Sequence, residues 1–393
     1  MATEQKSAVI LGSNLRRLRQ AQKLSQAEIA KRSNLSRVGY RNIEMGTATP
    51  KADTLMRLAK ALSVGLEDLV RPARELSAVR FRARKKMTSR EHLLVEVGRW
   101  IDNYSYLEDL LDDRQEFAFH ALAQKLQRRK RKPTTPIEAA AEARLAAGLE
   151  PGDTIRDICG LLEEKGGVKL FTPQVASEGF FGLSLGPNGD GPAVVVNTWE
   201  RITVERWIFT AAHELGHILL HHDAFDVDEA DENLEEEREA DLFASHFLMP
   251  DDVFKKELRE ARGLSLLQVV MKLKAIFRVS WKTVVYRLAQ EAGPNGRKIW
   301  AGFHAEAKRR FGRTFGPKEE PNALQEDKWY SPSPVLRLAD EPENLRSSAF
   351  VEDRLSRLVR KAIESEKITM SRGAEILMVS ASEMRALTRS WLD

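Results

Sequence analysis

The amino-acid sequence predicts a multidomain protein with an all-α N-terminal domain, a central α+β domain built on a small sheet, and a helical C-terminal module. Its length of 393 residues exceeds what one ordinary hydrophobic core holds. Apolar residues recur with helical spacing towards both ends, whereas β-like runs gather between residues 167 and 198. The domain boundaries that we expect are 10–72, 73–136, 137–292 and 293–393.

The composition predicts a folded, cytoplasmic protein. Hydrophobic residues make up 42% of the chain and charged residues 31%, which is typical of a globular protein. No apolar run approaches the roughly 20 residues that span a bilayer, and we do not expect the stretch "MATEQKSAVI" to act as a secretory signal. Cys159 is the only cysteine, which excludes disulfides within the chain and fits a reducing compartment. We therefore expect no membrane partner.

Charge is distributed unevenly along the chain. Residues 1–86 contain 19 Lys/Arg and 7 Asp/Glu, a net charge of +12, whereas the remaining 307 residues contain 43 and 51, a net charge of −8. A basic N-terminal region in an otherwise acidic chain favours a polyanionic partner for residues 1–86. The alternative is an ordinary solvated face, and charge alone does not decide between the two.

The first predicted domain is a cluster of short helices. Ser25 and Glu28 have the spacing of a capping box, and Ser36 can cap a following helix over residues 37–44. Two short helices at such a sharp corner form a helix-turn-helix, whose second helix can enter the major groove of DNA. The expected core consists of Leu15, Leu18, Leu24, Ile29, Ala30, Tyr40, Ile43, Leu55, Leu58 and Leu62.

The rest of the chain alternates between helical segments, a short β region and connecting segments. Helices are expected over about 89–126, 137–165, 204–250 with an acidic loop inside it, 264–292, and the last 48 residues. Strands are expected at 167–171, 179–186 and 192–198. Irregular segments are expected at 71–86, 128–136 and 294–345, the last with short helices. No internal repeat of fixed period is visible.

The segment 14–70 resembles the xenobiotic-response-element and phage-repressor family of helix-turn-helix domains. The resemblance rests on "LSQAEIA", "LSRVGYRNIEMG" and "LMRLAKALSVGLEDL". It implies a protein that binds an operator in double-stranded DNA, as a homodimer on two half-sites. It also implies an internal ion pair between Arg19 and Glu44. The DNA-contacting candidates that it supplies are Gln26, Ser36, Arg37, Val38, Arg41 and Asn42.

The stretch "AAHELGHILLHH" predicts a metal site on a helix. His213 and His217 lie four residues apart, only about 40° round a helix, so both imidazoles project from one face and can hold one Zn²⁺. Glu214 between them is placed to act as a general base on a water that zinc makes acidic. The alternative is a helix with unrelated histidines, because the five-residue motif alone is only moderately specific.

A catalytic zinc site needs a third protein ligand. Asp223 would serve only if the chain turned sharply after His217, which the intervening Leu220 disfavours. Glu237 and Asp241 share one face of a later helix, so Glu237 can bind the metal while Asp241 orients a ligand histidine. Glu239 lies on another face and is the weaker alternative.

The arrangement over 137–292 resembles the ImmA/IrrE family of zinc metallopeptidases. The residues that carry the resemblance are "PAVVVNT", "RITVERWIFTAAHELGHILLH" and "EREADLFASHFLMP", in this order. The resemblance implies a zincin-like fold in which His213, His217 and Glu237 bind zinc and Glu214 is the base. His221 is implied to pack rather than to bind metal, and His222 has no assigned task. His246 is expected at a polar rim.

Two functions follow from joining these regions. In the first, a DNA-bound transcriptional regulator carries a zinc-dependent endopeptidase that cleaves a repressor or its own linker. In the second, the chain is a transcription factor or antitoxin-like binder whose zinc domain senses metal or a ligand without proteolysis. The C-terminal segment "ITMSRGAEILMVSASEMRALTRSW" has a helix, a short turn with Ser380, and another helix. It is either a docking tail or a second helix-turn-helix.

Overall fold

The structure is a computed structural model that describes residues 2–22, 24–62, 64–70, 76, 79–83, 90–128, 132, 134–176, 180–187, 191–221, 233–315 and 341–391. The chain forms two compact units. Unit 1 contains Met1–Leu76, Lys86–Arg114 and Asp353–Asp393. Unit 2 contains Ser77–Lys85 and Gln115–Glu352. This division differs from the boundaries expected at 136 and 292, and the domains defined from sequence stay a prediction.

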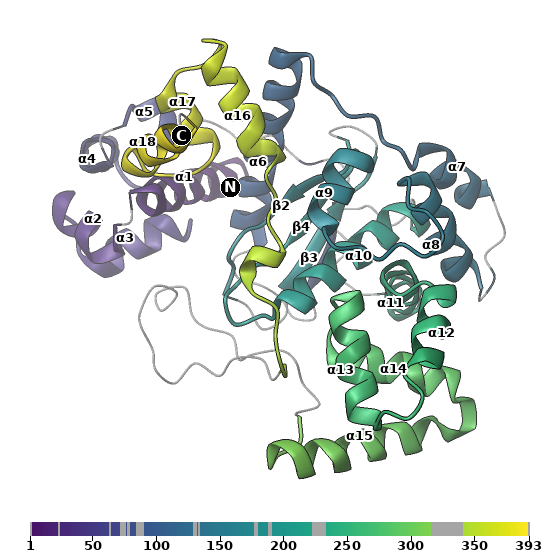
Figure 1. The fold of residues 1–393 in the computed structure, drawn as a ribbon. Coiled ribbons are helices and arrows are strands. Elements are labelled where there is room, and N and C mark those ends of the chain that lie inside the picture. Colours follow the sequence, from purple (N-terminus) through teal and green to yellow (C-terminus); the bar gives the residue numbers. More distant parts are fainter. Residues whose placement is uncertain are drawn as a thin grey trace. The chain divides into compact units, whose positions relative to one another are not determined.

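Unit 1 begins with the helical cluster that the sequence predicts (Figure 1). Its helices are α1 (Ala2–Ala21), α2 (Gln26–Arg32), α3 (Arg37–Glu44), α4 (Ala52–Leu62) and α5 (Leu66–Val70). The predicted capping box at Ser25 is present, and Ser36 caps α3 by accepting a hydrogen bond from the backbone N–H of Gly39. Every residue expected in the core belongs to it, with Leu18, Leu24 and Leu55 partly buried.

The remainder of unit 1 is also helical. It consists of α6 (Arg90–Leu111), α16 (Arg354–Glu364), α17 (Met370–Ile376) and α18 (Ala381–Ser390). Helix α6 contacts both α1 and α16, so it joins the N-terminal cluster to the C-terminal module within this unit. Buried Arg354 reaches Glu108 and Asp113 at the end of α6.

Unit 2 contains a four-stranded sheet with the strand order β1-β3-β4-β2. Figure 1 labels its strands β2, β3 and β4. Its strands are β1 (Val79–Ala83), β2 (Lys169–Phe171), β3 (Phe180–Leu185) and β4 (Ala193–Val196). Strand β3 is antiparallel to both β1 and β4, whereas β2 is parallel to β4. All residues of β3 and β4 are buried.

Helices α10 (Val204–Leu220) and α11 (Leu234–Leu248) form the centre of unit 2. Helix α10 packs on β3, β4 and α11, and α11 also packs on α8 (Thr135–Ala146). The other elements are α7 (His120–Arg128), α9 (Ile158–Gly160), the π-helical turn η1 (Leu161–Lys165), α12 (Asp251–Glu260), α13 (Leu266–Phe277), α14 (Trp281–Glu291), η3 (Gly293–Asn295), α15 (Gly296–Phe311) and η5 (Ser347–Ala349). The three strands and the helical pair expected at 264–292 are thereby confirmed.

A buried charged cluster ties later segments of unit 2 to α10. Lys274 Nζ lies 2.5 Å from Glu205 Oε1 and 3.4 Å from Glu341 Oε1. Glu205 also accepts a hydrogen bond of 2.8 Å from the backbone N–H of Leu345. Buried charges are stable only when they are paired in this way, so the cluster fixes the first turn of α10.

Several expectations for the connecting segments are wrong. The segment 71–86, expected as a linker, contains β1, whose pairing with β3 could not be read from its basic sequence. The helix expected over 89–126 stops at Leu111, because Asp112 adopts a φ of 50°. The helix expected over 137–165 is interrupted after Ala146, where Gly148 and Gly152 adopt positive φ. Residues 296–311, expected as loop with short helices, form the 16-residue helix α15.

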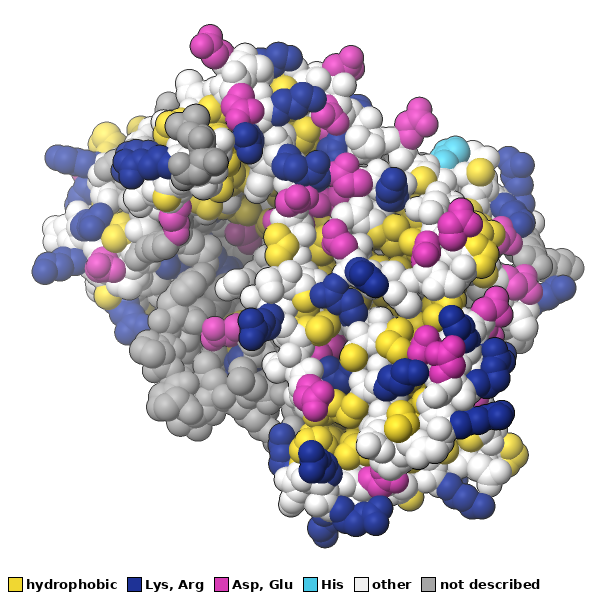
Figure 2. All heavy atoms as spheres, in the orientation of Figure 1, with side chains coloured by type: hydrophobic (Ala, Val, Ile, Leu, Met, Phe, Trp, Pro, Cys, Tyr) yellow, Lys and Arg dark blue, Asp and Glu magenta, His cyan; other side chains and the backbone are white. Residues whose placement is uncertain are grey.

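The surface of the molecule is mixed in character. On the face drawn in Figure 2, Lys and Arg side chains are interspersed with Asp and Glu, and hydrophobic side chains show between them. No helix among the described residues combines the length and the apolar character needed to cross a membrane.

Candidate metal centre and nucleic-acid interface

Helix α10 is buried because its sequence is apolar on nearly every face. Thr203 begins the helix by accepting a hydrogen bond from the backbone N–H of Arg206. Gly216 in the middle allows α11 to approach closely, since a Cβ at this position would lie 2.9 Å from the ring of Phe243. The polar residues of α10 are therefore forced to find partners inside the protein.

Three side chains from α10 and α11 converge at one point. His217 Nε2 lies 3.1 Å from Glu237 Oε1, and His213 Nε2 lies 3.4 Å from Glu237 Oε2. The two Nε2 atoms are 2.9 Å apart. Candidate ligand atoms of all three residues lie within 4.8 Å of one another. The structure thus brings together the three ligand positions expected from the sequence.

Asp241 lies where the helical spacing places it. Its Oδ1 accepts a hydrogen bond from His213 Nδ1 at 2.8 Å, and 51% of its side chain is exposed. A carboxylate at Nδ1 fixes the ring as the tautomer whose Nε2 carries a lone pair. Asp241 therefore directs the basic nitrogen of His213 towards Glu237.

His217 is held by a second chain of contacts that the sequence reasoning missed. His217 Nδ1 lies 2.8 Å from His221 Nδ1, and His221 Nε2 lies 2.9 Å from Glu239 Oε2. Because the carboxylate of Glu239 accepts the proton at Nε2, Nδ1 of His221 carries the lone pair that accepts the Nδ1 proton of His217. Glu239, considered above only as an alternative ligand, thus acts through His221. The signal in the sequence was the third histidine, one helical turn beyond His217.

These contacts test whether a metal ion fits. Both rings are fixed with lone pairs on Nε2, yet these atoms lie 2.9 Å apart beside a carboxylate. Two lone pairs at this distance repel unless a cation, either a metal ion or a proton, lies between the groups. Two histidines and one glutamate are a ligand set of catalytic zinc sites. The residues present therefore fit a divalent metal ion.

Glu214 is fully buried and lies against the sheet. A Cβ on Gly182 of β3 would come within 2.9 Å of Glu214 Oε1 and 2.8 Å of the backbone oxygen of Val195. Only glycine leaves room here for the carboxylate, so Gly182 belongs to the site. The sequence predicts a strand at this position but gives no reason to single out its glycine.

His246 lies apart from the three converging residues. Its Nδ1 is 2.9 Å from Asp251 Oδ1, and Arg287 contacts the same oxygen. Burial and the nearby Arg287 charge lower the pKa of His246 to about 4. The rim position expected for His246 is instead a buried one, with 10% of the side chain exposed. His222 and Asp223 lie outside the described residues.

The second candidate site is the exposed face of α3. Arg37, Val38, Arg41 and Asn42 are all exposed, and Val38 reaches 67%. Ser36 uses its hydroxyl to cap the helix. Gln26 donates a hydrogen bond of 3.0 Å to Glu44 Oε1. Helix α3 therefore presents two arginines, a valine and an asparagine to solvent.

The expected ion pair between α1 and α3 is present. Arg19 Nη2 and Nε lie 2.7 and 2.8 Å from the two oxygens of Glu44. Burial raises the pKa of Glu44, but the hydrogen bonds and charge of Arg19 outweigh it and hold this pKa below its ordinary value. The pair fixes the orientation of α3 relative to the first helix.

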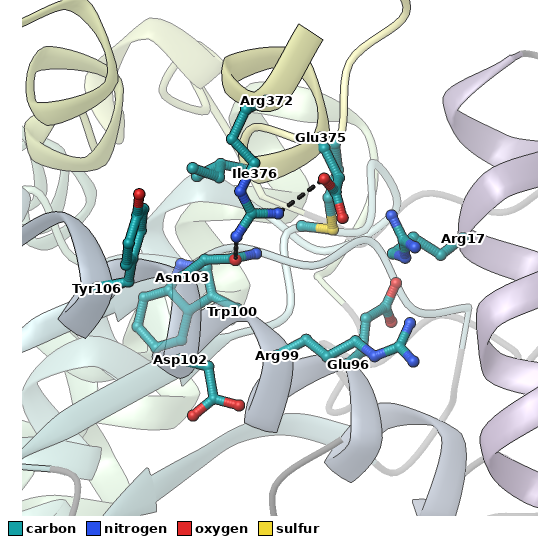
Figure 3. Close-up of a pocket in the computed structure, with 11 residues that line it drawn as sticks. Arg17, Glu96, Arg99, Trp100, Asp102, Asn103, Tyr106, Arg372, Glu375 and Ile376 are labelled. Carbon is teal, nitrogen blue, oxygen red and sulfur yellow. Dashed lines mark hydrogen bonds and ion pairs between the residues drawn. The ribbon is translucent and has the colours of Figure 1, made fainter. Parts of the chain in front are cut away.

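Unit 1 also contains a pocket of about 490 Å³, lined by residues of α1, α6, α17 and the turn that follows it (Figure 3). Its volume lies in the range of small-molecule sites. Arg372 on its wall donates to Asn103 at 2.7 Å and pairs with Glu375 at 2.7 Å. The pocket includes none of the residues predicted as sites, and its paired charges indicate no ligand class.

Comparisons with known proteins agree with both resemblances. Residues 15–69 match a helix-turn-helix family model, and residues 167–289 match the model of the IrrE N-terminal-like domain of the M78 peptidases. An uncharacterized HTH-type transcriptional regulator, y4dJ, of Sinorhizobium fredii is 39% identical over 66 residues. The match covers 17% of this chain and 86% of that protein.

Proposed function

The chain belongs to the helix-turn-helix transcriptional regulators and carries a domain of the M78 peptidase family, and from this premise we propose that it is a DNA-bound regulator with a zinc-dependent endopeptidase. The observation that carries the proposal is the convergence of His213, His217 and Glu237 beside an intact, buried Glu214. Zinc is the metal that this ligand set favours.

The proposed reaction is hydrolysis of a peptide bond. A bound zinc ion would supply Lewis acidity towards a water and the scissile carbonyl. Asp241 and the His221–Glu239 pair hold the two imidazoles with their Nε2 lone pairs facing Glu237. Glu214 takes the proton of the attacking water and transfers it to the departing amine. The peptide C–N bond breaks, and water supplies the oxygen of the new carboxylate.

The proposed substrate is a repressor protein or the chain's own linker. A peptidase carried on a DNA-binding chain is concentrated where regulators are bound, so its cleavage controls transcription rather than digesting proteins. Arg37, Val38, Arg41 and Asn42 are the proposed DNA contacts, with Gln26 and Ser36 at the helix ends. The proposal includes a homodimer on two operator half-sites.

Cleavage by the purified chain tests the proposal. The zinc-loaded protein is incubated with the proteins encoded beside its gene, and the fragments and its own integrity are measured by mass spectrometry. Glu214→Gln should abolish cleavage while it retains zinc, whereas Glu260→Gln, an exposed glutamate of α12, should cut normally. Equal cleavage by Glu214→Gln and the unaltered chain would exclude Glu214 as the base.

A non-proteolytic sensor is the second candidate. The burial of the centre favours it, since His213, His217 and Glu214 are 0% exposed and only 11% of the Glu237 side chain is exposed. In this case zinc would change DNA affinity, and no cleavage would appear. Zinc-dependent DNA affinity that survives in Glu214→Gln supports this candidate against the endopeptidase.

A further inference from the structure

The C-terminal module repeats the geometry of the N-terminal helix-turn-helix. Ser25 and Ser36 cap α2 and α3, and Thr369 and Ser380 cap α17 and α18. The interval between the two caps is identical in the two regions. Helices α2 and α17 each contain 7 residues. Position by position, residue 25 therefore corresponds to 369, and residue 36 to 380.

The turn between the two helices is the same in both regions. Asn34 adopts a left-handed φ of 55°, and Met378 at the corresponding position adopts 56°. The residue that follows donates a hydrogen bond to the corresponding backbone carbonyl in each region. Leu35 N–H donates to Ala30, and Val379 N–H donates to Ala374. Left-handed conformations are uncommon for residues other than glycine, so their coincidence indicates one shared turn geometry.

The cores correspond as well. Leu15 on α1 and Val359 on α16 are both 0% exposed, as are Tyr40 and Met384 on the second helices of the two turns. Gly373 takes the place of Ile29, and a Cβ there would lie 2.7 Å from Ile363 Cδ1. The smaller residue lets α16 pack closer against α17. Identical residues at corresponding positions are Arg16 and Arg360, Lys23 and Lys367, Ala30 and Ala374, Ser36 and Ser380, and Arg41 and Arg385.

The two regions differ at the ion pair that joins the first and third helices. Ile363 and Thr388 occupy the positions of Arg19 and Glu44, so the second region cannot form this ion pair. Helix α17 is instead anchored to α6, through the hydrogen bond from Arg372 to Asn103 (Figure 3). This contact is made by a residue of α17 and does not involve α18.

The outer face of α18 has the character of a DNA-contacting surface. Its exposed residues are Ala381, Ser382, Arg385, Ala386, Arg389 and Ser390. Of these, Ala381, Ser382, Arg385 and Ala386 occupy the positions that correspond to Arg37, Val38, Arg41 and Asn42 of α3. The exposed set contains two arginines and no carboxylate, and neither arginine forms an ion pair with any described residue. Glu383, the acidic residue of the helix, is used in the capping box with Ser380.

We propose that residues 354–390 form a second helix-turn-helix that binds double-stranded DNA, with α18 in the major groove and Arg385 and Arg389 on bases or phosphates. Small Ala381 and Ala386 permit close approach of the helix to the groove, and Ser382 can donate to either a base or a phosphate. The chain then carries two DNA-reading helices. This inference goes beyond the proposed function and needs neither zinc nor proteolysis.

Measured DNA affinity tests the inference in the full chain. The probe is a labelled duplex pool of random sequence, about 40 base pairs long so that it spans more than one half-site spacing. We compare the unaltered chain, Arg385→Ala/Arg389→Ala in α18, Arg37→Ala/Arg41→Ala in α3, and Lys256→Ala/Arg259→Ala in α12 as a control with equal charge loss. Ala386→Glu is a second α18 variant at an exposed position. Fluorescence anisotropy is recorded over a range of salt concentrations.

The α18 double variant should lose about tenfold or more in affinity, and its salt slope should fall by about two, one for each arginine that contacts phosphate. Ala386→Glu should also weaken binding, while the α12 control binds like the unaltered chain. Unchanged affinity of both α18 variants overturns the inference and leaves α18 as a protein-docking helix. An equal loss in the α12 control also overturns it, because general charge then explains binding.

The α3 variant distinguishes this inference from the proposed function. Loss of binding only in the α3 variant leaves the first helix-turn-helix as the DNA reader and overturns the second. Loss of binding only in the α18 variants supports the second module and contradicts DNA binding by α3. All altered side chains are exposed, so each variant should keep the thermal unfolding temperature of the unaltered chain.

Discussion

Histidine orientation at the candidate metal centre depends on groups that are not ligands. Asp241 accepts the Nδ1 proton of His213, and Glu239 acts on His217 through the intervening His221. The two arrangements are different, one direct and one relayed, yet both leave Nε2 basic. A residue that fixes a tautomer in this way raises metal affinity without touching the metal.

His221→Ala should therefore weaken zinc binding by about 10- to 100-fold, as loss of such an outer partner does in other sites. The affinity is measured by competition with a chromophoric zinc chelator, which requires no catalytic activity. His120→Ala removes an exposed histidine of α7 and should leave the affinity unchanged. Unaltered affinity in His221→Ala would mean that the relay does not orient His217.

The titration of His246 should make unit 2 sensitive to acid. Its pKa is lowered from 6.5 to about 4, first by burial and then by Arg287, so the unfolded chain binds a proton that the folded chain does not. Stability therefore falls as the pH drops from about 6.5 to about 4, by on the order of 3 kcal/mol for this residue. His246→Gln should lose this part of the pH dependence in urea unfolding, and exposed His120→Gln should retain it. Parallel pH profiles for His246→Gln and the unaltered chain would contradict the prediction.

At the scale of elements, the helix-turn-helix depends on one buried charge pair. Arg19 and Glu44 are only 7% and 2% exposed, and their hydrogen bonds join α1 to the end of α3. Removing one partner leaves a buried charge without compensation, which is far costlier than losing a surface pair. The orientation of α3, whose exposed face is proposed to contact DNA, therefore depends on two buried residues.

Arg19→Met should destabilise unit 1 by about 3–5 kcal/mol. Arg57→Met removes the half-buried partner of exposed Asp53 in α4 and should cost less than about 1 kcal/mol. Denaturant unfolding followed by circular dichroism measures both. Because the pKa of Glu44 is lowered, the stability that its pair contributes is present above the unfolded pKa and is lost as the pH falls. Similar losses in the two variants would show that the Arg19 pair is not specially important.

Elements with strong local signals could be predicted from the sequence, whereas those fixed by distant contacts could not. The caps at Ser25 and Ser36, the strands near 167–198 and the spacing of His213 with His217 are local features, and the structure contains each of them. Strand β1 forms only through pairing with β3, far along the chain, so its basic sequence concealed it. A second helix-turn-helix was one of two interpretations of the C-terminal segment, but its correspondence to residues 15–41 was not visible in the sequence, because identical residues are few.

Candidate site residues show the same distinction. Helical spacing predicted that Glu237 and Asp241 would share a face, and both reach the histidines of α10. The role of Gly182 follows from a close approach between a strand and a helix, which no spacing rule contains. His221 was assigned to packing, because the contact with Glu239 depends on how α10 and α11 cross.

At the scale of the whole molecule, the chain combines a basic region with an acidic body. Residues 1–86 carry +12 and the rest −8, so attraction to DNA is concentrated at the N-terminal end, although the C-terminal module adds exposed Arg385 and Arg389. Under the two proposals, one chain contains two DNA-reading helices and a centre that hydrolyses peptide bonds. This combination is suited to regulation, since binding to DNA brings the centre to other bound regulators.

Zinc content per chain tests the central claim most directly, because every proposed step at α10 depends on a metal held by His213, His217 and Glu237. We expect inductively coupled plasma mass spectrometry to find about one zinc ion per purified chain. His217→Ala and Glu237→Ala should lose most of it, whereas His120→Ala should keep it. Zinc content that is equally high in all four proteins, or absent from the unaltered chain after zinc loading, would contradict the account.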